Sequence, residues 1–155
     1  MTELQYLTFF VGDEVFALDV LKIHEIIPFD NITHIPRMQP YMLGVMNIRG
    51  NIIPIVSLNK RLDLHLSMES KKKSIMIISL NYNGENQEVG VIVSKVDKVY
   101  TLTSDQIEPS PTFGSKIKKE FIKNIAAFDN QFISILDIDE ILNLEDLSST
   151  TQEIV

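Results

Sequence analysis

Two charged side chains, Glu25 and Arg49, stand in apolar surroundings where their chemistry needs an explanation. Glu25 lies inside the apolar segment 23–27, and Arg49 lies at the turn between the apolar runs 45–48 and 52–58. A guanidinium presents a rigid fork of N–H donors that matches the two oxygens of a carboxylate. The two side chains could therefore pair, either to anchor the turn or to form a recognition site that a partner covers.

The same residues suggest one catalytic alternative, a small enzyme that uses Glu25 and His24 together with Arg49. Adjacent residues on a strand point to opposite sides, so Glu25 and His24 are not expected to converge on one substrate. The sequence also lacks the phosphate-binding Gly-x-x-x-x-Gly-Lys motif and the Gly-x-Ser-x-Gly nucleophile motif. We therefore expect a protein that is not an enzyme.

Metal, cofactor and nucleic-acid binding are also not expected. The three histidines, His24, His34 and His65, lack the spacing of a zinc site, and the chain has no cysteine. Asp137 and Asp139 begin like a calcium loop but lack its glycine and later ligands, so a helix cap is favoured. With 14 Lys and Arg against 21 Asp and Glu, the net charge of −7 opposes binding to a polyanion.

The sequence predicts a cytoplasmic protein that does not insert into a membrane. No apolar run approaches the ~20 residues of a membrane-spanning helix. The first five residues, Met-Thr-Glu-Leu-Gln, contain no basic stretch ahead of an apolar segment, so no signal peptide is visible. The absence of cysteine is compatible with a reducing compartment.

Short runs rich in β-branched residues, separated by turn residues, predict an all-β chain. Hairpins are expected from 6–11 with 15–19, 45–48 with 52–58, 74–82 with 88–93, and 125–128 with 131–136. In the second hairpin, Gly50 and Asn51 are the residues expected to take positive φ. Pro54 has no N–H, which predicts an edge strand or a bulge. Short helical turns are expected at 59–64, at 116–123 and after a capping box formed by Asp137 and Glu140.

An internal repeat suggests how these strands are grouped. Residues 52–58 match residues 132–138 in apolar pattern at an offset of 80, and residues 22–26 match residues 95–99 at an offset of 73. Pattern alone leaves duplication and chance similarity both open. A duplication would give two small all-β halves, which avoid exposed sheet edges by closing into barrels. We expect barrel one at roughly 15–66, barrel two at roughly 74–144 with the N-terminal strand possibly shared, and a flexible tail at 148–155.

Several separated motifs resemble the CheW family of bacterial chemotaxis coupling proteins. The central one is Gly44-Val45-Met46-Asn47-Ile48-Arg49-Gly50 followed by Ile53-Pro54-Ile55-Val56, which is similar to the family's Asn-Leu-Arg-Gly signature. Residues 6–14, 19–26, 105–113 and 135–142 also resemble the family, in the family's order. Two departures are Ile48 in place of a leucine and Ser94 where an aspartate is common. The replacement of leucine by Ile48 conserves side-chain volume. Ser94 affects one local contact.

The resemblance implies a fold and a role. The implied fold is two intertwined, five-stranded barrels of the Src-homology-three type within a single domain at 1–147, with short helical turns. The implied role is an adaptor that joins the histidine kinase CheA, through its regulatory domain, to the cytoplasmic hairpin tip of methyl-accepting chemoreceptors at the inner face of the membrane. An adaptor of a nonflagellar chemosensory system is an alternative that the sequence does not separate.

The resemblance also implies site residues. Glu25 and Arg49 correspond to receptor-facing residues, and the groove between the barrels corresponds to the receptor-binding groove. The positions that match the lining of this groove are Ile23, Gly44, Ile75, Val96 and Val99. Phe113 matches a phenylalanine that helps to build kinase–adaptor rings.

Overall fold

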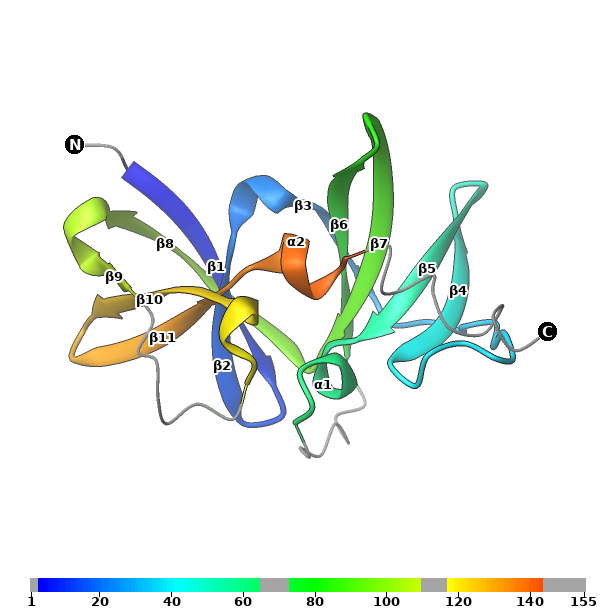
Figure 1. Ribbon diagram of the computed structural model, residues 1–155, viewed down its shortest axis with the longest axis horizontal. Coiled ribbons are helices and arrows are strands. Elements are labelled where there is room, and N and C mark those ends of the chain that lie inside the picture. The colour runs from blue at the N-terminus through cyan, green and yellow to red at the C-terminus, as the bar shows by residue number, and fades with distance from the viewer. Residues whose placement is uncertain (1–2, 65–72, 110–116, 144–155) are drawn as a thin grey trace.

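The computed structural model describes residues 3–64, 73–109 and 117–143, and within them the chain forms two β-sheets with short helical turns (Figure 1). The all-β expectation is therefore confirmed. The five-stranded sheet has the order β3-β6-β7-β5-β4. Its strands are β3 (Ile23–Pro28), β4 (Met42–Ile48), β5 (Asn51–Ser57), β6 (Ser74–Tyr82) and β7 (Glu85–Val93).

The six-stranded sheet has the order β8-β1-β2-β11-β10-β9. Its strands are β1 (Glu3–Val11), β2 (Glu14–Asp19), β8 (Lys95–Thr103), β9 (Ile107–Pro109), β10 (Ile122–Phe128) and β11 (Gln131–Leu136). Each sheet contains one parallel pair, β5 with β7 and β11 with β2, and its other neighbours are antiparallel.

The sheets exchange hairpins, which corrects the expected barrel boundaries. The β6–β7 hairpin, expected in barrel two, pairs with β3 and β5 in the five-stranded sheet. The β2 strand, expected in barrel one, pairs with β1 and β11 in the six-stranded sheet. The first half of the chain thus contributes one hairpin to the second sheet, and the second half contributes one hairpin to the first.

The register of the parallel pairs supports the internal repeat. Ile55 lies opposite Gly90 in one sheet, and Ile135 lies opposite Ala17 in the other. These two pairs are related by the offset of 80 on one strand and the offset of 73 on the other, the same offsets that the sequence suggests. The two sheets are therefore built on one plan.

Two of the helical turns in the described residues, α1 (Leu58–Arg61) and α2 (Ile138–Ile141), follow the same repeat. The other helical turns there are η1 (Val20–Lys22), η2 (Ser104–Gln106) and η3 (Lys119–Phe121). The side chain of Ser57 accepts a hydrogen bond from the backbone N–H of Lys60, and Asp137 accepts one from Glu140, each at 3.3 Å. The expected helix after Asp137 is confirmed, and its cap stands 80 residues after that of α1.

The β4–β5 turn is tighter than expected. Its two central residues are Arg49, with φ of 52°, and Gly50, with φ of 85°, while Asn51 already pairs with Ile48 as the first residue of β5. Positive φ at both central residues is the signature of a type I′ turn, which matches the twist of a hairpin. The side-chain oxygen of Asn47 accepts a hydrogen bond from the Gly50 N–H at 2.9 Å.

Pro54 does not lie on an edge strand, because β5 has β4 on one side and β7 on the other. The pairing of β5 with β7 begins only at Ile55, one residue after Pro54. A proline is tolerated there because no β7 residue pairs with it.

Three apolar clusters hold the sheets. One lies within the five-stranded sheet and includes Ile48, Ile55 and Ile77, and one lies within the six-stranded sheet and includes Tyr6 and Ile135. The third is the largest and joins the two sheets; its buried members include Phe9, Leu18, Val56, Met76, Val91, Leu136 and Leu142. The sheets therefore have cores of their own and also share one.

Candidate functional site at the open edge of the five-stranded sheet

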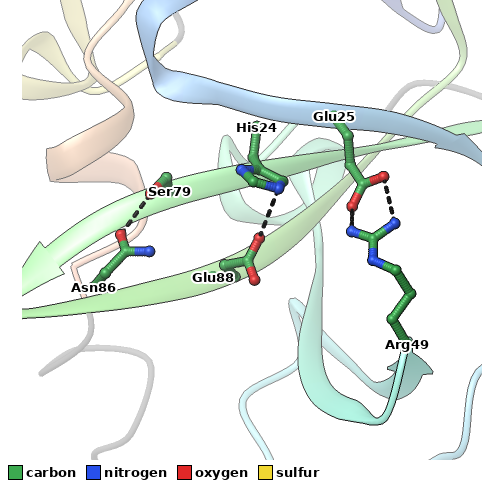
Figure 2. Close-up of polar contacts among 6 residues, drawn as sticks. All are labelled: His24, Glu25, Arg49, Ser79, Asn86 and Glu88. Atoms are coloured by element: carbon green, nitrogen blue, oxygen red, sulfur yellow. Dashed lines mark hydrogen bonds and ion pairs between the residues drawn. The ribbon is translucent and has the colours of Figure 1, made fainter.

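Glu25 and Arg49 are brought together, as the sequence suggests (Figure 2). The Arg49 guanidinium donates two hydrogen bonds to the Glu25 carboxylate, Nη1 to Oε2 at 3.0 Å and Nη2 to Oε1. Glu25 lies on β3 and Arg49 at the tip of the β4–β5 hairpin, and β3 and β4 are the two edge strands of the five-stranded sheet. The ion pair therefore joins the two edges of this sheet.

A backbone contact closes the same gap further along the edges. Thr33, in the connection after β3, exchanges two hydrogen bonds with Val45 on β4, each at 2.9 Å. Gly44 makes this approach possible, because its φ is 146° and a Cβ there would lie 2.1 Å from the Thr33 carbonyl oxygen. Gly44 was expected to line the receptor groove, but it is buried. Its evident role is to let the connection pack against β4.

The ion pair fixes the protonation state of both partners. The pKa of Glu25 is lowered from its ordinary value, chiefly by the hydrogen bonds from Arg49. Desolvation opposes this shift, and the charges of Arg49 and His24 add smaller lowering effects. The pKa of Arg49 is raised by the same hydrogen bonds and charge. Glu25 therefore remains a carboxylate near neutral pH and is a poor general acid or base there.

A backbone irregularity brings His24 to the same side as Glu25. The register of β3 against β6 shifts between Ile23 and Glu25, so His24 is the extra residue of a bulge. In Figure 2 both side chains point toward β7 and the β4–β5 tip, with His24 Nε2 4.0 Å from Oε2 of Glu88. The expectation that His24 and Glu25 face opposite sides is therefore wrong, because alternation fails at a bulge. Glu25 is still not a suitable base for the enzyme alternative, since Arg49 occupies its carboxylate.

Glu88 belongs to this polar strip, although sequence analysis did not select it. Its Oε2 atom is buried and accepts no hydrogen bond within the described residues, while its charge contributes to the raised pKa of Arg49. Ser79 and Asn86 extend the strip along the β6–β7 hairpin through a hydrogen bond of 2.5 Å (Figure 2). No local motif around Glu88 distinguishes it from an ordinary strand carboxylate, so only the register of β3, β6 and β7 reveals it.

The expected groove residues fall into three groups. Ile23 on β3 and Val96 on β8 are partly buried and pack against the shared core, and Val99 on β8 is 54% exposed. Ile75 on β6 is fully buried in the core of the five-stranded sheet, so its side chain does not line a surface groove. Both faces of β6 are covered: Ile75 and Ile77 pack into the core of the five-stranded sheet, and the alternate residues Met76 and Ile78 pack into the shared core. Phe113 lies outside the described residues.

Ser94 makes two local hydrogen bonds at a position where the CheW family commonly has an aspartate. Its Oγ accepts a hydrogen bond from the Gly12 N–H at 2.8 Å, and its own N–H donates to the Phe10 carbonyl at 2.8 Å. The departure from the family pattern therefore keeps an acceptor that holds the β1–β2 turn against the start of β8.

Neither a metal cluster nor a membrane helix is found within residues 3–64, 73–109 and 117–143. No group of three or more His, Asp or Glu side chains there is placed to hold an ion. No helix in the same ranges has the length and apolar character needed to cross a bilayer.

Comparisons with known proteins agree with this geometry. The family model that describes the CheW-like domain matches residues 5–146. The chemotaxis protein CheW of Klebsiella aerogenes is 31% identical over 144 residues, which cover 93% of this chain and 84% of that protein. The CheW of Thermotoga maritima is 33% identical, with 92% of this chain and 89% of that protein covered.

A solved structure shows the same fold. The crystal structure of the scaffolding protein TtCheW from Thermoanaerobacter tengcongensis superposes with a TM-score of 0.79 at 31% identity, covering 88% of this chain and 90% of that one. The match of fold and of sequence over nearly the whole chain leads to one conclusion. This chain belongs to the CheW-like family of chemotaxis adaptors.

Proposed function

We propose that this protein couples methyl-accepting chemoreceptors to the histidine kinase CheA at the cytoplasmic face of the membrane, acting as a scaffold and catalysing no reaction. The relatives are named as chemotaxis and scaffolding proteins, which supports this role. The observation that carries the proposal is the Glu25–Arg49 pair, which places matched charges on the rim of the five-stranded sheet, two residues along β3 from the partly buried Ile23.

The proposed receptor-facing surface combines this pair with the apolar residues Ile23, Val96 and Val99. The pair presents polar groups in a fixed geometry, because both oxygens of Glu25 are held by one guanidinium. The apolar residues give the tip of a helical hairpin a place to bury its own apolar side chains. Coupling is then physical: one assembly holds receptor and kinase, and a change in the receptor biases the kinase equilibrium through that contact.

The test is receptor-dependent kinase activation in reconstituted arrays with Arg49→Glu, Glu25→Arg and the charge-swapped double variant. Each single variant places like charges side by side, so activation should fall by about tenfold or more. The double variant restores opposite charges and should recover part of the loss. Thermal unfolding of all three variants should show folded proteins, because both side chains are partly exposed.

The outcome that would contradict the pair as a functional unit is a double variant whose defect is the sum of the two single defects. A single variant with normal activation would contradict it as well. A matched control is Lys123→Glu, a charge reversal of an exposed residue on β10, which should couple normally.

We further propose that Phe113 contributes to the contact with the kinase or with a neighbouring adaptor. Prolines at 109 and 111 precede Phe113 in the sequence, and an aromatic side chain is a common interface anchor. Phe113→Ser should weaken array assembly, measured by co-sedimentation with receptor and kinase, while the thermal midpoint changes little. A large drop in the midpoint would instead show that the ring completes the core.

A further inference from the structure

Positive charge is concentrated in one part of this acidic chain. Residues 31–62 contain no aspartate or glutamate, although the whole chain carries 21 of them, and they include four cations, Arg37, Arg49, Lys60 and Arg61. This stretch forms the β3–β4 connection, the β4–β5 hairpin and α1. This stretch of the chain is therefore basic, while the molecule as a whole is acidic.

Two of the four cations have evident partners within the molecule. Arg49 pairs with Glu25, and Arg61 donates a hydrogen bond from Nε to the Ile141 carbonyl at 2.7 Å. Within the described ranges, no hydrogen bond or ion pair joins the side chain of Arg37 or Lys60 to another residue. Both side chains are exposed. Two exposed cations are thus available to a ligand.

Arg37 and Lys60 lie on the rim of one surface hollow. The hollow has a volume of about 240 Å³, and its lining includes both cations together with His34, Met38, Met42 and Leu43. Three apolar side chains thus stand beside groups that bind carboxylates. Methionine is flexible and polarisable, so such a lining adapts to the shape of an inserted side chain.

The connection that forms the hollow is held in place along its length. The Met42 N–H donates to the Gln39 carbonyl at 2.9 Å, and the Ser57 N–H donates to the Tyr41 carbonyl at 2.8 Å. Arg37 has φ of 64°, a left-handed conformation that is unfavourable for a residue with a Cβ. The hollow is therefore formed before any ligand arrives, and Arg37 keeps a backbone conformation for which a glycine would be better suited.

We propose that this hollow binds an acidic, amphipathic peptide segment of a partner protein. One apolar side chain of the segment packs on Met38, Met42 and Leu43, while neighbouring carboxylates pair with Arg37 and Lys60. The argument is charge complementarity, because both cations line the hollow together with apolar side chains. A nucleic acid fits less well, since the net charge of −7 repels a long polyanion. The hollow is distinct from the Glu25–Arg49 pair, so this inference does not depend on the proposed function.

The test is a methyl NMR titration of the full chain with three short peptides. The probe is acetyl-Glu-Glu-Leu-Glu-Glu-amide, and its matched peptides replace every glutamate by glutamine or the leucine by glycine. The ε-methyl groups of Met38 and Met42 should shift with the probe, while that of Met76, which is fully buried, should not. Each matched peptide should bind about tenfold more weakly than the probe. Added salt should weaken the binding of the probe, since salt screens exposed ion pairs.

The double variant Arg37→Glu with Lys60→Glu should abolish the shifts. Its matched control reverses two exposed cations elsewhere, Lys119→Glu with Lys123→Glu, and should bind the probe as the native chain does. The proposal is overturned if no methyl shifts, if the glutamine peptide binds equally well, or if the charge-reversed hollow still binds. It is also overturned if inorganic phosphate or a short oligonucleotide gives the same shifts and binds more tightly than the probe.

Discussion

At the scale of single residues, Arg49 has a backbone conformation that is unfavourable for an arginine. The first central residue of a type I′ turn takes positive φ, which costs a residue with a Cβ about 1–2 kcal/mol unless it is Asn or Asp. Two other two-residue hairpin turns use Asn83 with Gly84 and Asp129 with Asn130, all with positive φ, while the β1–β2 turn uses Gly12, with positive φ, and Asp13. Among the hairpin turns of the described residues, only the β4–β5 turn places a long cation at a positive-φ position, and that cation reaches Glu25.

We therefore predict that Arg49→Asn separates folding from coupling. Asparagine suits positive φ, so the thermal midpoint of the variant should equal or exceed that of the native chain. Receptor-dependent kinase activation should nevertheless fall, because the carboxylate of Glu25 loses its partner. Differential scanning calorimetry and the reconstituted activation assay would measure the two effects. A clear loss of thermal stability would show that the arginine serves the fold.

A second prediction at this scale concerns pH. The pKa of Glu25 is lower in the folded chain than its ordinary value. The pair therefore stabilises the fold at pH values above the ordinary pKa of a glutamate. That stabilisation is lost as the pH falls through the lowered pKa. In Arg49→Gln, the pKa of Glu25 should rise toward its ordinary range, as measured by ¹³C NMR titration of the carboxyl carbon. An unchanged pKa would mean that Arg49 is not the main cause of the shift.

At the scale of elements, the closure of the five-stranded sheet depends on a glycine. Gly44→Ala would place a Cβ 2.1 Å from the Thr33 carbonyl oxygen, whereas Gly50→Ala would meet no atom within 4 Å. We predict a loss of about 2–4 kcal/mol for Gly44→Ala, and about 1–2 kcal/mol for Gly50→Ala, which suffers only from its backbone conformation. Urea unfolding of both variants would check the order. Equal losses would indicate that the Thr33–Val45 contact contributes little.

The elements themselves were largely predictable, because hairpins carry local signals. The hairpins expected from 74–82 with 88–93 and from 125–128 with 131–136 are present, with turns at Asn83-Gly84 and Asp129-Asn130, and Asp137 caps α2 as expected. The pairing of Glu25 with Arg49 was also suggested by two charges in apolar segments. The bulge at His24 was not, since a register shift depends on β6, which is far away in the sequence. For the same reason, the position of Glu88 and the burial of Ile75 were not predicted from the sequence.

At the scale of the whole molecule, the exchange of hairpins explains why the barrel boundaries were wrong. Each half of the chain contains a hairpin and three further strands of the repeated plan, so either half has the strands of a complete barrel. Local pattern does not say whether β3 pairs with β1 or with β6, and the structure pairs it with β6. The contact of Arg61 Nε with the carbonyl of Ile141, 80 residues later, reflects the symmetry between the two halves of the chain. Residues that meet their own repeats lie beside a pseudo-two-fold axis.

This exchange predicts that neither half folds alone. A chain cut between residues 64 and 73 gives one fragment with β1 to β5 and another with β6 to β11, and each lacks the partners of its hairpin. The shared core would also be divided, because Phe9 and Val56 come from one fragment and Met76 and Leu136 from the other. The intact chain should therefore unfold in one transition, with calorimetric and van't Hoff enthalpies equal. Each fragment should lack a cooperative transition, and an equimolar mixture should regain the circular dichroism spectrum of the intact chain. A fragment that unfolds cooperatively by itself would show that the strands of one half can pair among themselves, and the exchange would then be a choice between two folds of similar stability.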